Sequence, residues 1–243
     1  MIKINNIYKS FGNFKVLQGV NLNVEENKIL SVVGKSGTGK SVLLKSILGL
    51  ITYDKGNIEI DGINTNGFSE AEFNKYIRHK MTLVFQNGAL WDSMTVGANI
   101  DLALQIQKHL DVTEREKRIK ESLEAVGLIN IRNVYPNELS GGMLKRAAIA
   151  RAIAMKPKYL LYDEPTTGLD PILSNIINNL IKKLNVEMGI TSLIISHDIK
   201  GVESISDDVA MLYEGKIILT CKAKEMWEQN NQIFNNFIRG KIT

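Results

Sequence analysis

The sequence predicts an α/β fold in which helices cover both faces of a mostly parallel sheet. Short apolar runs typical of buried strands alternate with longer segments of helical periodicity. A glycine-rich turn at residues 34–39 lies between one such run and a helix, and residues 87–138 are almost entirely helical. We therefore expect a single domain over residues 1–243. Its parts are a core at about 1–86 and 156–220 with an N-terminal antiparallel β subdomain, an inserted α-helical subdomain at about 87–155, and a helical tail at 221–243.

Strands are expected in the first 33 residues. Ile2 and Ile4 alternate with polar neighbours, and the apolar residues within 20–24 do the same. Residues 28–33 form a continuous apolar run, which is typical of a strand buried on both faces. After the glycine turn, residues 42–50 have helical spacing that stops at Gly49.

The later elements follow from the same periodicities. Thr113 with Glu116 three residues later is typical of a capping box, which predicts the start of a helix at 113–126. Asp170 and Pro171 suit the cap and first turn of another helix. In chain order we expect a hairpin strand at 57–60, a helix at 69–80, a strand at 81–85, helices at 95–108, 113–126 and 142–155, a strand at 159–162, a helix at 171–188, strands at 191–196 and 209–213, a turn at 214–215 and a terminal helix at 223–239.

Composition excludes several classes of protein. The chain is 44% apolar and 23% charged, a balance typical of soluble globular proteins and not of disorder. It has no apolar run of the roughly 20 residues that a membrane-spanning helix needs, and residues 1–10 show no signal-peptide pattern. A single cysteine, Cys221, predicts a reducing, cytosolic compartment. The net charge of +4 permits an anionic ligand, nucleic acid or lipid surface and selects none of them.

A phosphate-binding loop is the most informative motif. The string Gly34-Lys35-Ser36-Gly37-Thr38-Gly39-Lys40-Ser41 matches G-x-x-x-x-G-K-[ST] in full, between an expected strand and an expected helix. Backbone N–H groups of such a loop form an anion nest, and glycines let the chain approach phosphates closely. Lys40 would supply a mobile charge to the β- and γ-phosphates, and Ser41 a hydroxyl to Mg²⁺. The motif predicts nucleotide binding without saying what the nucleotide is used for.

Two carboxylates end the apolar strand at 159–162. Asp163 can face the Mg²⁺ of the glycine loop. Side chains alternate along a strand, so Glu164 points elsewhere and suits a second task, which is to orient or deprotonate an attacking water. Without the glycine loop, this pair would be read as a common acidic surface pair.

A second candidate phosphate cradle is Leu139-Ser140-Gly141-Gly142-Met143, directly before the helix at 142–155. A hydroxyl and bare backbone N–H groups at a helix start favour an anion. Two cradles and one catalytic carboxylate in one chain suggest that two chains share each nucleotide. The alternative is a Ser-Gly-Gly helix entry that binds no ligand.

These elements, in this order and spacing, resemble the ATP-binding cassette (ABC) ATPases of membrane transporters. The resemblance covers roughly residues 1–220 and rests on the glycine loop, the Leu-Ser-Gly-Gly string and four further elements. It implies a P-loop NTPase core, ATP and Mg²⁺ as ligands, and ATP hydrolysis coupled to transport. The four further elements are Gln86, Asp163-Glu164, Gly168-Leu169-Asp170 and His197.

The resemblance also implies roles for particular residues. Phe11 lies where the family stacks an aromatic ring on adenine, with Tyr8 as the fallback, although Phe11 suits the core of the β subdomain equally well. Gln86 corresponds to the glutamine that touches Mg²⁺ and senses the membrane partner. Asp170 would organise the contact between two ATPase subunits, or act simply as a helix cap. His197, after the strand at 191–196, corresponds to the histidine that contacts the γ-phosphate.

Two positions depart from the family pattern. Met143 stands where glutamine is commoner and cannot repeat its hydrogen bonds. Val42 stands where a second hydroxyl is common, so one contact to the nucleotide is lost and a modestly lower affinity is expected. With the strings at 86–91 and 142–146, these features resemble the ATPases of bacterial MCE-type lipid transporters, which include the Mla phospholipid system and its toluene-tolerance (Mkl-like) relatives.

The resemblance implies a set of partners. Two copies would close head to tail around two ATP, and a separate integral membrane permease would carry the cargo, with an MCE substrate-binding protein and a small accessory subunit as further candidates. The ATPase would then be cytoplasmic and peripheral on the inner membrane, and no nucleic acid is expected. Leu90 and Trp91 lie where the permease would dock, or else belong to the core.

Other readings stay open at this point. Amino-acid import or lipoprotein export fits the same ATPase, because the permease chooses the cargo. An ABC switch on DNA or ribosomes is disfavoured by a single glycine loop and the absence of a long coiled coil. A non-hydrolysing nucleotide-binding module is disfavoured by Glu164 and His197. In the tail, Met226, Ile233, Phe234 and Phe237 recur at near-helical spacing, which predicts core or, alternatively, a docking face.

Overall fold

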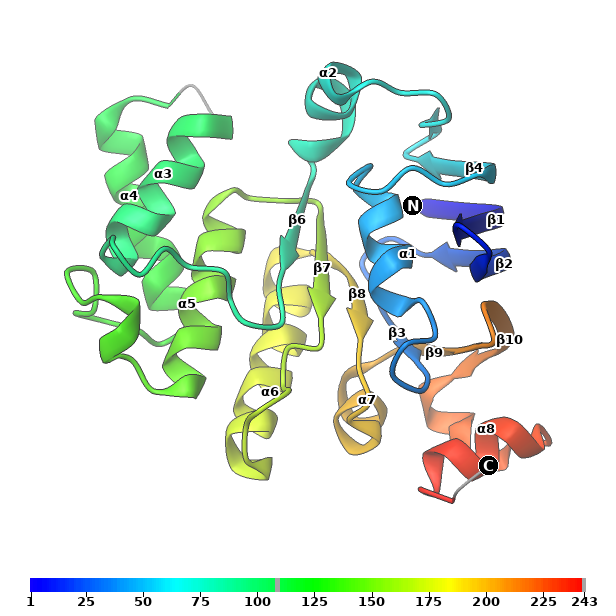
Figure 1. Cartoon of the computed structure of the whole chain (residues 1–243). Coiled ribbons are helices and arrows are strands. Elements are labelled where there is room, and N and C mark those ends of the chain that lie inside the picture. The colour runs from blue at the N-terminus through cyan, green and yellow to red at the C-terminus, as the bar shows by residue number, and fades with distance from the viewer. Residues whose placement is uncertain (108–109, 242–243) are drawn as a thin grey trace.

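In the computed structural model, which describes residues 1–107 and 110–241, helices pack beside two β-sheets, and the smaller sheet lies at the right-hand edge of the view in Figure 1. The larger sheet has the strand order β10-β9-β3-β8-β7-β6. Strand β10 runs antiparallel to β9, and the other neighbours are parallel, which confirms the predicted mostly parallel sheet. Its strands are β3 (Ile29–Val33), β6 (Met81–Val84), β7 (Tyr159–Asp163), β8 (Thr191–Ile195), β9 (Asp208–Tyr213) and β10 (Lys216–Lys222).

The smaller sheet confirms the predicted N-terminal antiparallel β subdomain. Its strand order is β2-β1-β4-β5, and each neighbouring pair is antiparallel. Strand β1 pairs with β2 through several register shifts and reaches the turn where Phe11 lies opposite Phe14. The strands are β1 (Ile2–Phe11), β2 (Phe14–Val24), β4 (Lys55–Ile60) and β5 (Ile63–Asn64).

The helices divide by position, as Figure 1 shows. Helices α3, α4 and α5 gather beyond β6, whereas α1 follows the glycine loop and lies by the smaller sheet. The α-helices are α1 (Lys40–Ile47), α2 (Glu70–Phe73), α3 (Val96–Gln107), α4 (Val112–Ala125), α5 (Gly141–Ala154), α6 (Pro171–Met188), α7 (Ile199–Ile205) and α8 (Gln232–Ile238). Shorter turns of other helix types are η1 (Asn74–Arg78), η2 (Pro136–Glu138) and η3 (Ala223–Glu228).

Three apolar clusters hold these elements together. The first joins the smaller sheet to α1 and the parallel sheet, and the second packs α3–α6 on the parallel sheet. The third lies under the tail, where Met226 and Phe234 are fully buried against Val33 and Met211. Burial of a large apolar side chain contributes about 1.5–3 kcal/mol, so the tail belongs to the folded core.

Helix α4 does not begin as predicted. The expected capping box at Thr113 is wrong, because the helix starts at Val112 and the Asp111 carboxylate accepts the N–H of Glu114 at 2.8 Å. Glu116 instead pairs with Arg132. An aspartate two residues earlier satisfies the exposed N–H groups equally well, so the same physical rule selects a different residue. For the predicted helix at 95–108, α3 begins at Val96, and Lys108 lies outside the described residues.

The terminal helix predicted at 223–239 is two elements. A 3₁₀ segment, η3, ends at Glu228, and α8 begins after Asn231, whose side chain accepts the N–H of Phe234 at 3.0 Å. Strand β10 and helix α7 were not predicted. The apolar run of β10, an edge strand, is only three residues long, at 217–219, and polar residues flank it.

Two smaller findings complete the fold. Ser69 and Glu72 form a capping box, and the predicted helix at 69–80 continues from α2 into a turn of π-helix. Among the helices of residues 1–107 and 110–241, none combines the length and the apolar character needed to cross a membrane.

Candidate functional site

The predicted site residues gather at the carboxyl edge of the parallel sheet. The glycine loop follows β3, Asp163 ends β7, and His197 follows β8 by two residues. Gln86 follows β6 in the same way. Ligands of open α/β sheets bind outside this edge, so the topology alone brings together residues that lie far apart in the sequence.

The glycine loop has a backbone that larger residues cannot follow. Gly37 has a φ of +80° and Gly39 a φ of +101°. A Cβ built on Gly34 would lie 2.3 Å from the backbone oxygen of Leu212. Gly39 is the N-cap of α1 and offers no side chain, which leaves the amides at the start of α1 to an anion.

Lys40 lies folded into the loop. Its ammonium donates to the carbonyl oxygens of Gly34 and Lys35 at 2.8 Å each. Burial lowers the pKa of Lys40, and the charges of Glu164 and Asp163 act in the opposite direction. The side chain is therefore already positioned at the loop, where two backbone oxygens hold its ammonium group.

Ser41 and Asp163 are in direct contact. The Ser41 Oγ donates to Asp163 Oδ1 at 2.9 Å. Burial raises the pKa of Asp163, Glu164 beside it adds to the rise, and the bond from Ser41 opposes it. A hydroxyl and a carboxylate are hard oxygen ligands of the kind that Mg²⁺ selects, so the donors present fit that ion.

Glu164 has an unusual backbone conformation. Its φ of +50° is rare for a residue with a side chain, and its N–H donates to Ile195 at 2.9 Å. The carboxylate accepts a 2.9 Å bond from the Thr167 hydroxyl and lies 3.4 Å from His197 Nδ1. Strain of this kind persists where the surrounding structure fixes a functional side chain. Thr167 was not predicted; a hydroxyl three residues after the glutamate is the signal that could have found it.

An open groove of about 550 Å³ runs over the glycine loop. It is large enough for much of a nucleotide, and Phe11 is half-exposed at its border, so the core interpretation of Phe11 is wrong. Tyr8 does not line it. Phe14 does, and it is 67% exposed at the other end of the same turn, a residue that sequence reasoning missed. The lining residues are Phe11, Phe14, Val16, Ser36, Gly37, Gly39, Lys40, Ser41, Val42, Gln86 and Glu164.

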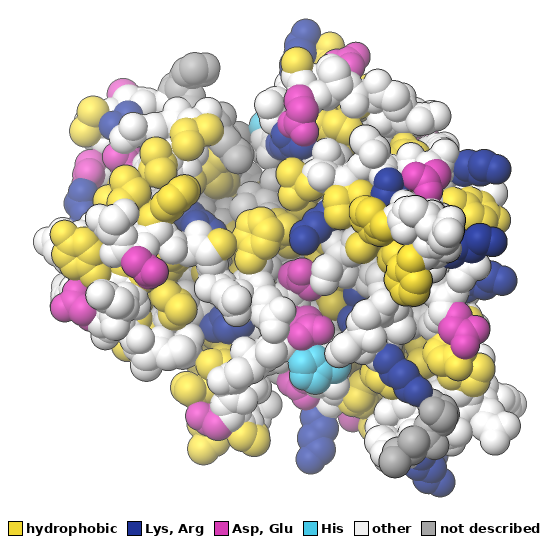
Figure 2. Space-filling model, in the orientation of Figure 1, with side chains coloured by type: hydrophobic (Ala, Val, Ile, Leu, Met, Phe, Trp, Pro, Cys, Tyr) yellow, Lys and Arg dark blue, Asp and Glu magenta, His cyan; other side chains and the backbone are white. Residues whose placement is uncertain are grey.

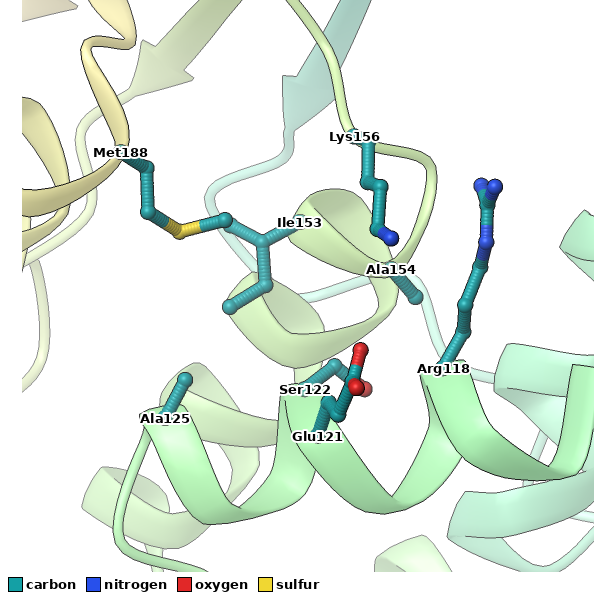
Figure 3. Close-up of a pocket in the computed structure, with 8 residues that line it drawn as sticks. All are labelled: Arg118, Glu121, Ser122, Ala125, Ile153, Ala154, Lys156 and Met188. Carbon is teal, nitrogen blue, oxygen red and sulfur yellow. The ribbon is translucent and has the colours of Figure 1, made fainter. Parts of the chain in front are cut away.

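The surrounding surface is mixed in character. Figure 2 shows Lys and Arg side chains interspersed with acidic and apolar ones, and the face is hollowed between the α3–α5 helices and the rest of the molecule. A separate cavity between α4, α5 and Met188, drawn in Figure 3, holds only about 60 Å³. That cavity is far too small for a nucleotide. The groove over the glycine loop is the candidate site because Lys40, Ser41 and Glu164 line it.

The second cradle lies outside that groove. Ser140 caps α5 and accepts the N–H of Met143 at 3.4 Å, and both Ser140 and Gly141 are exposed. Gly142 is buried, and a Cβ there would lie 3.1 Å from Leu173. Asp170 caps α6 by accepting two N–H groups at 2.8 and 2.9 Å, as its cap interpretation predicted. Ser140 and Gly141 are thus exposed and are not among the residues that line the groove over the glycine loop.

This fold and this groove define the ATPase class of the ABC transporters, and the chain belongs to that family. The sequence profile described as "ABC transporter" matches residues 17–167. The chain is 34% identical to the intermembrane phospholipid transport system ATP-binding protein MlaF of Haemophilus influenzae, over 99% of this chain and 91% of that protein. It is 36% identical to the methionine import ATP-binding protein MetN of Clostridium tetani, over 93% of this chain and 71% of that protein.

A solved structure extends the comparison. The ATP-binding cassette MJ0796, a dimer in a post-hydrolysis state bound to ADP and Pi, superposes with a TM-score of 0.84 at 35% identity. The match covers 92% of this chain and 99% of that one. The chain is thus the ATP-hydrolysing subunit of an ABC transporter, as its motifs predicted.

Proposed function

We propose that this subunit powers a transporter that moves phospholipid or a related lipid, of the MCE/Mla type. The observation that carries the proposal is the 34% identity to an intermembrane phospholipid ATPase over 91% of that protein's length. The strings at residues 86–91 and 142–146, which border the groove and the second cradle, are the local features that resemble this branch of the family.

Within the groove, each functional residue has one task. Lys40 binds the β- and γ-phosphates, and the amides of the glycine loop cradle them. Glu164 orients the attacking water and accepts its proton, because its carboxylate lines the groove and is held by Thr167. His197 contacts the γ-phosphate from the neighbouring strand end.

Ser41, Asp163 and Gln86 are the proposed holders of Mg²⁺. The Ser41–Asp163 contact of 2.9 Å already places two oxygen ligands together. Bound there, the ion would neutralise charge on the phosphates during transfer. Gln86 lines the groove with Ser41 and adds an amide oxygen.

A second copy completes the site. Ser140, Gly141 and Gly142 of one chain would face the nucleotide held by the glycine loop of the other, adding N–H donors and excluding water. Phe11 stacks on the base. Asp170, fixed as a helix cap, contacts the partner across the interface.

The wider assembly follows from this arrangement. The single domain of residues 1–243 comprises the core at 1–86 and 156–220, the helical insertion at 87–155 and the tail at 221–243. A membrane permease docks near Leu90 and Trp91, of which Trp91 is 63% exposed. The chain works on the cytoplasmic face of the inner membrane, with an MCE substrate-binding protein and a small accessory subunit as further partners.

Co-purification tests the cargo. The tagged chain is extracted from its own cells in mild detergent, and bound membrane proteins and lipids are identified by mass spectrometry. The complex is then reconstituted and assayed for ATP-dependent transfer of a fluorescent phospholipid between vesicles. Glu164→Gln serves as the inactive control. Transfer that requires an intact Glu164 supports the proposal, and a complex that transfers no lipid contradicts it.

Methionine import is the second candidate, because the MetN relative is 36% identical over 93% of this chain. The same reconstituted complex distinguishes the two. Hydrolysis stimulated by methionine and a methionine-binding protein, without lipid transfer, would assign the chain to amino-acid import.

A further inference from the structure

Two basic side chains of α5 hold the loop that follows β6. The Lys145 ammonium donates to the backbone oxygen of Gln86. The Arg151 guanidinium donates through Nη1 to Ala89 O at 2.6 Å and through Nη2 to Gly88 O at 2.9 Å. Three carbonyl groups of one short loop thus accept bonds from one helix.

Burial of these two cationic side chains is energetically costly. Lys145 is 7% exposed, and burial lowers the pKa of both Lys145 and Arg151. Within the described residues neither side chain has a carboxylate within 4.0 Å, although the charge of Glu164 acts on Lys145 at longer range. Buried charges without an ion partner depend on their hydrogen bonds. Here those bonds go to the loop that carries Gln86.

The loop is shaped to receive these bonds. Gly88 and Ala89 have φ values of +74° and +50°, and alanine rarely adopts such a backbone. A Cβ on Gly88 would lie 3.4 Å from Ala148 of α5, so the loop packs directly on the helix. On its far side, Asn99 of α3 is 2% exposed and donates to the Trp91 oxygen at 3.0 Å.

Helix α5 also carries the second cradle. Its N-cap is Ser140, and Lys145 lies on the same helix five residues later. A displacement of α5 would therefore move the carbonyl of Gln86 with it, and the Gln86 side chain faces the groove that holds Ser41 and Glu164.

We propose that Lys145 and Arg151 are positioning residues that fix Gln86 to α5, so that the helix presenting Ser140–Gly142 to one nucleotide also places Gln86 at the other. This inference rests on the proposed Mg²⁺ role of Gln86. Loss of an outer partner of a metal ligand typically costs 10–100-fold in metal affinity. The bonds from α5 go to backbone oxygens of the Gln86 loop and not to the Gln86 amide, so they act on the ligand through its backbone and the low end of that range is expected.

The experiment measures the Mg²⁺ concentration that gives half-maximal ATP hydrolysis. Lys145→Met keeps the buried stem but removes the donor, and should raise that concentration roughly 10-fold or more. Nucleotide affinity in EDTA should not change, because Lys40 is untouched. Lys145→Gln, which retains an N–H donor, should restore part of the loss.

Arg146→Met is the matched control. Arg146 is the next residue of α5, but it donates to the Val126 and Gly127 oxygens at 3.2 and 3.1 Å, away from the Gln86 loop. Its loss should lower stability while leaving the Mg²⁺ dependence as in the wild type. Arg151→Met gives a second test if Lys145→Met does not fold.

The Gln86→Ala variant tests the metal role of Gln86 separately from the positioning role of Lys145 and Arg151. If Gln86→Ala raises the Mg²⁺ requirement and Lys145→Met and Arg151→Met do not, the positioning role is overturned while the metal site stands. If Gln86→Ala has no effect, the metal role of Gln86 fails, and the inference fails with it. A shift in Lys145→Met that Arg146→Met reproduces would also overturn it, as general destabilisation.

Discussion

The Ser41 hydroxyl donates a 2.9 Å hydrogen bond to the Asp163 carboxylate, although 122 residues separate the two in the sequence. Strand β8 lies between the strands that precede them, so the contact spans a topological gap in the sheet. The contact places a hydroxyl beside a half-buried carboxylate. The negative charge of that carboxylate is costly to bury when no cation is bound and is stabilised when one is.

Asp163→Asn should stabilise the ligand-free chain at neutral pH and abolish Mg²⁺-dependent hydrolysis. Burial raises the pKa of Asp163 above its ordinary 3.8, so the folded state binds its proton more tightly than the unfolded state. The aspartate then contributes stability at acid pH that is lost as pH rises from 3.8 through the raised value. Asparagine keeps the acceptor for Ser41 without the charge. Thermal unfolding of both proteins from pH 4 to 8 checks this; a lower melting temperature for the variant at pH 7 would contradict it.

Glu164→Gln should bind ATP, accumulate as closed dimers and lose about 10²–10⁴-fold in turnover, because an amide cannot accept the proton of the attacking water. Phosphate release and size-exclusion chromatography measure the two effects. Glu203→Gln, whose carboxylate bonds only the Trp227 indole among the contacts described, is the matched control. Undiminished hydrolysis in Glu164→Gln would reject the catalytic assignment.

Lys40→Ala should remove a principal phosphate contact and weaken ATP binding strongly. The side chain reaches the loop carbonyls in the free protein and has no neighbouring lysine in the groove lining that could replace it. Calorimetric titration with ATP and Mg²⁺ provides the measurement. Lys182→Ala, at a surface lysine that donates to Ser204, should bind as the wild type. Wild-type affinity in Lys40→Ala would refute the loop assignment.

Phe11→Ala should lower ATP affinity roughly 5- to 150-fold, the equivalent of the ~1–3 kcal/mol that base–aromatic stacking contributes. Phe14→Ala tests the ring that lies opposite it in the turn and lines the same groove. Tyr8→Ala should have little effect, since Tyr8 lies outside that groove. Fluorescent-nucleotide titration of the three variants ranks them; a larger loss in Tyr8→Ala than in Phe11→Ala would reverse the assignment.

Phe234→Ala should destabilise the protein by about 3–5 kcal/mol, the usual cost of removing a fully buried phenylalanine. Urea unfolding measures the change. Deleting residues 221–243 should abolish folding, because it removes Met226 and Phe234 together. A truncated chain that still unfolds cooperatively, at the urea concentration at which the wild type unfolds, would show that the tail is dispensable for the fold.

The sequence predicted the strands and helices that local residue patterns determine. Strand β3 and helix α1 were found because a continuous apolar run and a glycine loop adjoin, and the sheet class followed from alternation. Helix α4 was given the wrong cap because Asp111 and Thr113 both suit that position. Strand β10 was not predicted because its apolar run, at residues 217–219, is shorter than those of the buried strands.

The sequence predicted the site residues whose positions follow from motif spacing. It missed the residues whose positions depend on tertiary contacts. Ser41 and Asp163 lie together as expected. The contact of Thr167 with Glu164 forms at a residue of positive φ, and the contact of Lys145 with Gln86 joins two segments 59 residues apart in the sequence. Phe14 was missed because only the turn that pairs it with Phe11 brings it to the groove.

The tail shares its apolar cluster with Val33, the last residue of β3 and the immediate neighbour of Gly34. The final segment of the chain therefore supports the strand from which the phosphate loop departs. A hybrid ATPase that joins this loop to the carboxyl-terminal segment of another protein will therefore need the matching residues on both β3 and the tail. Without them, we expect weaker binding of the triphosphate.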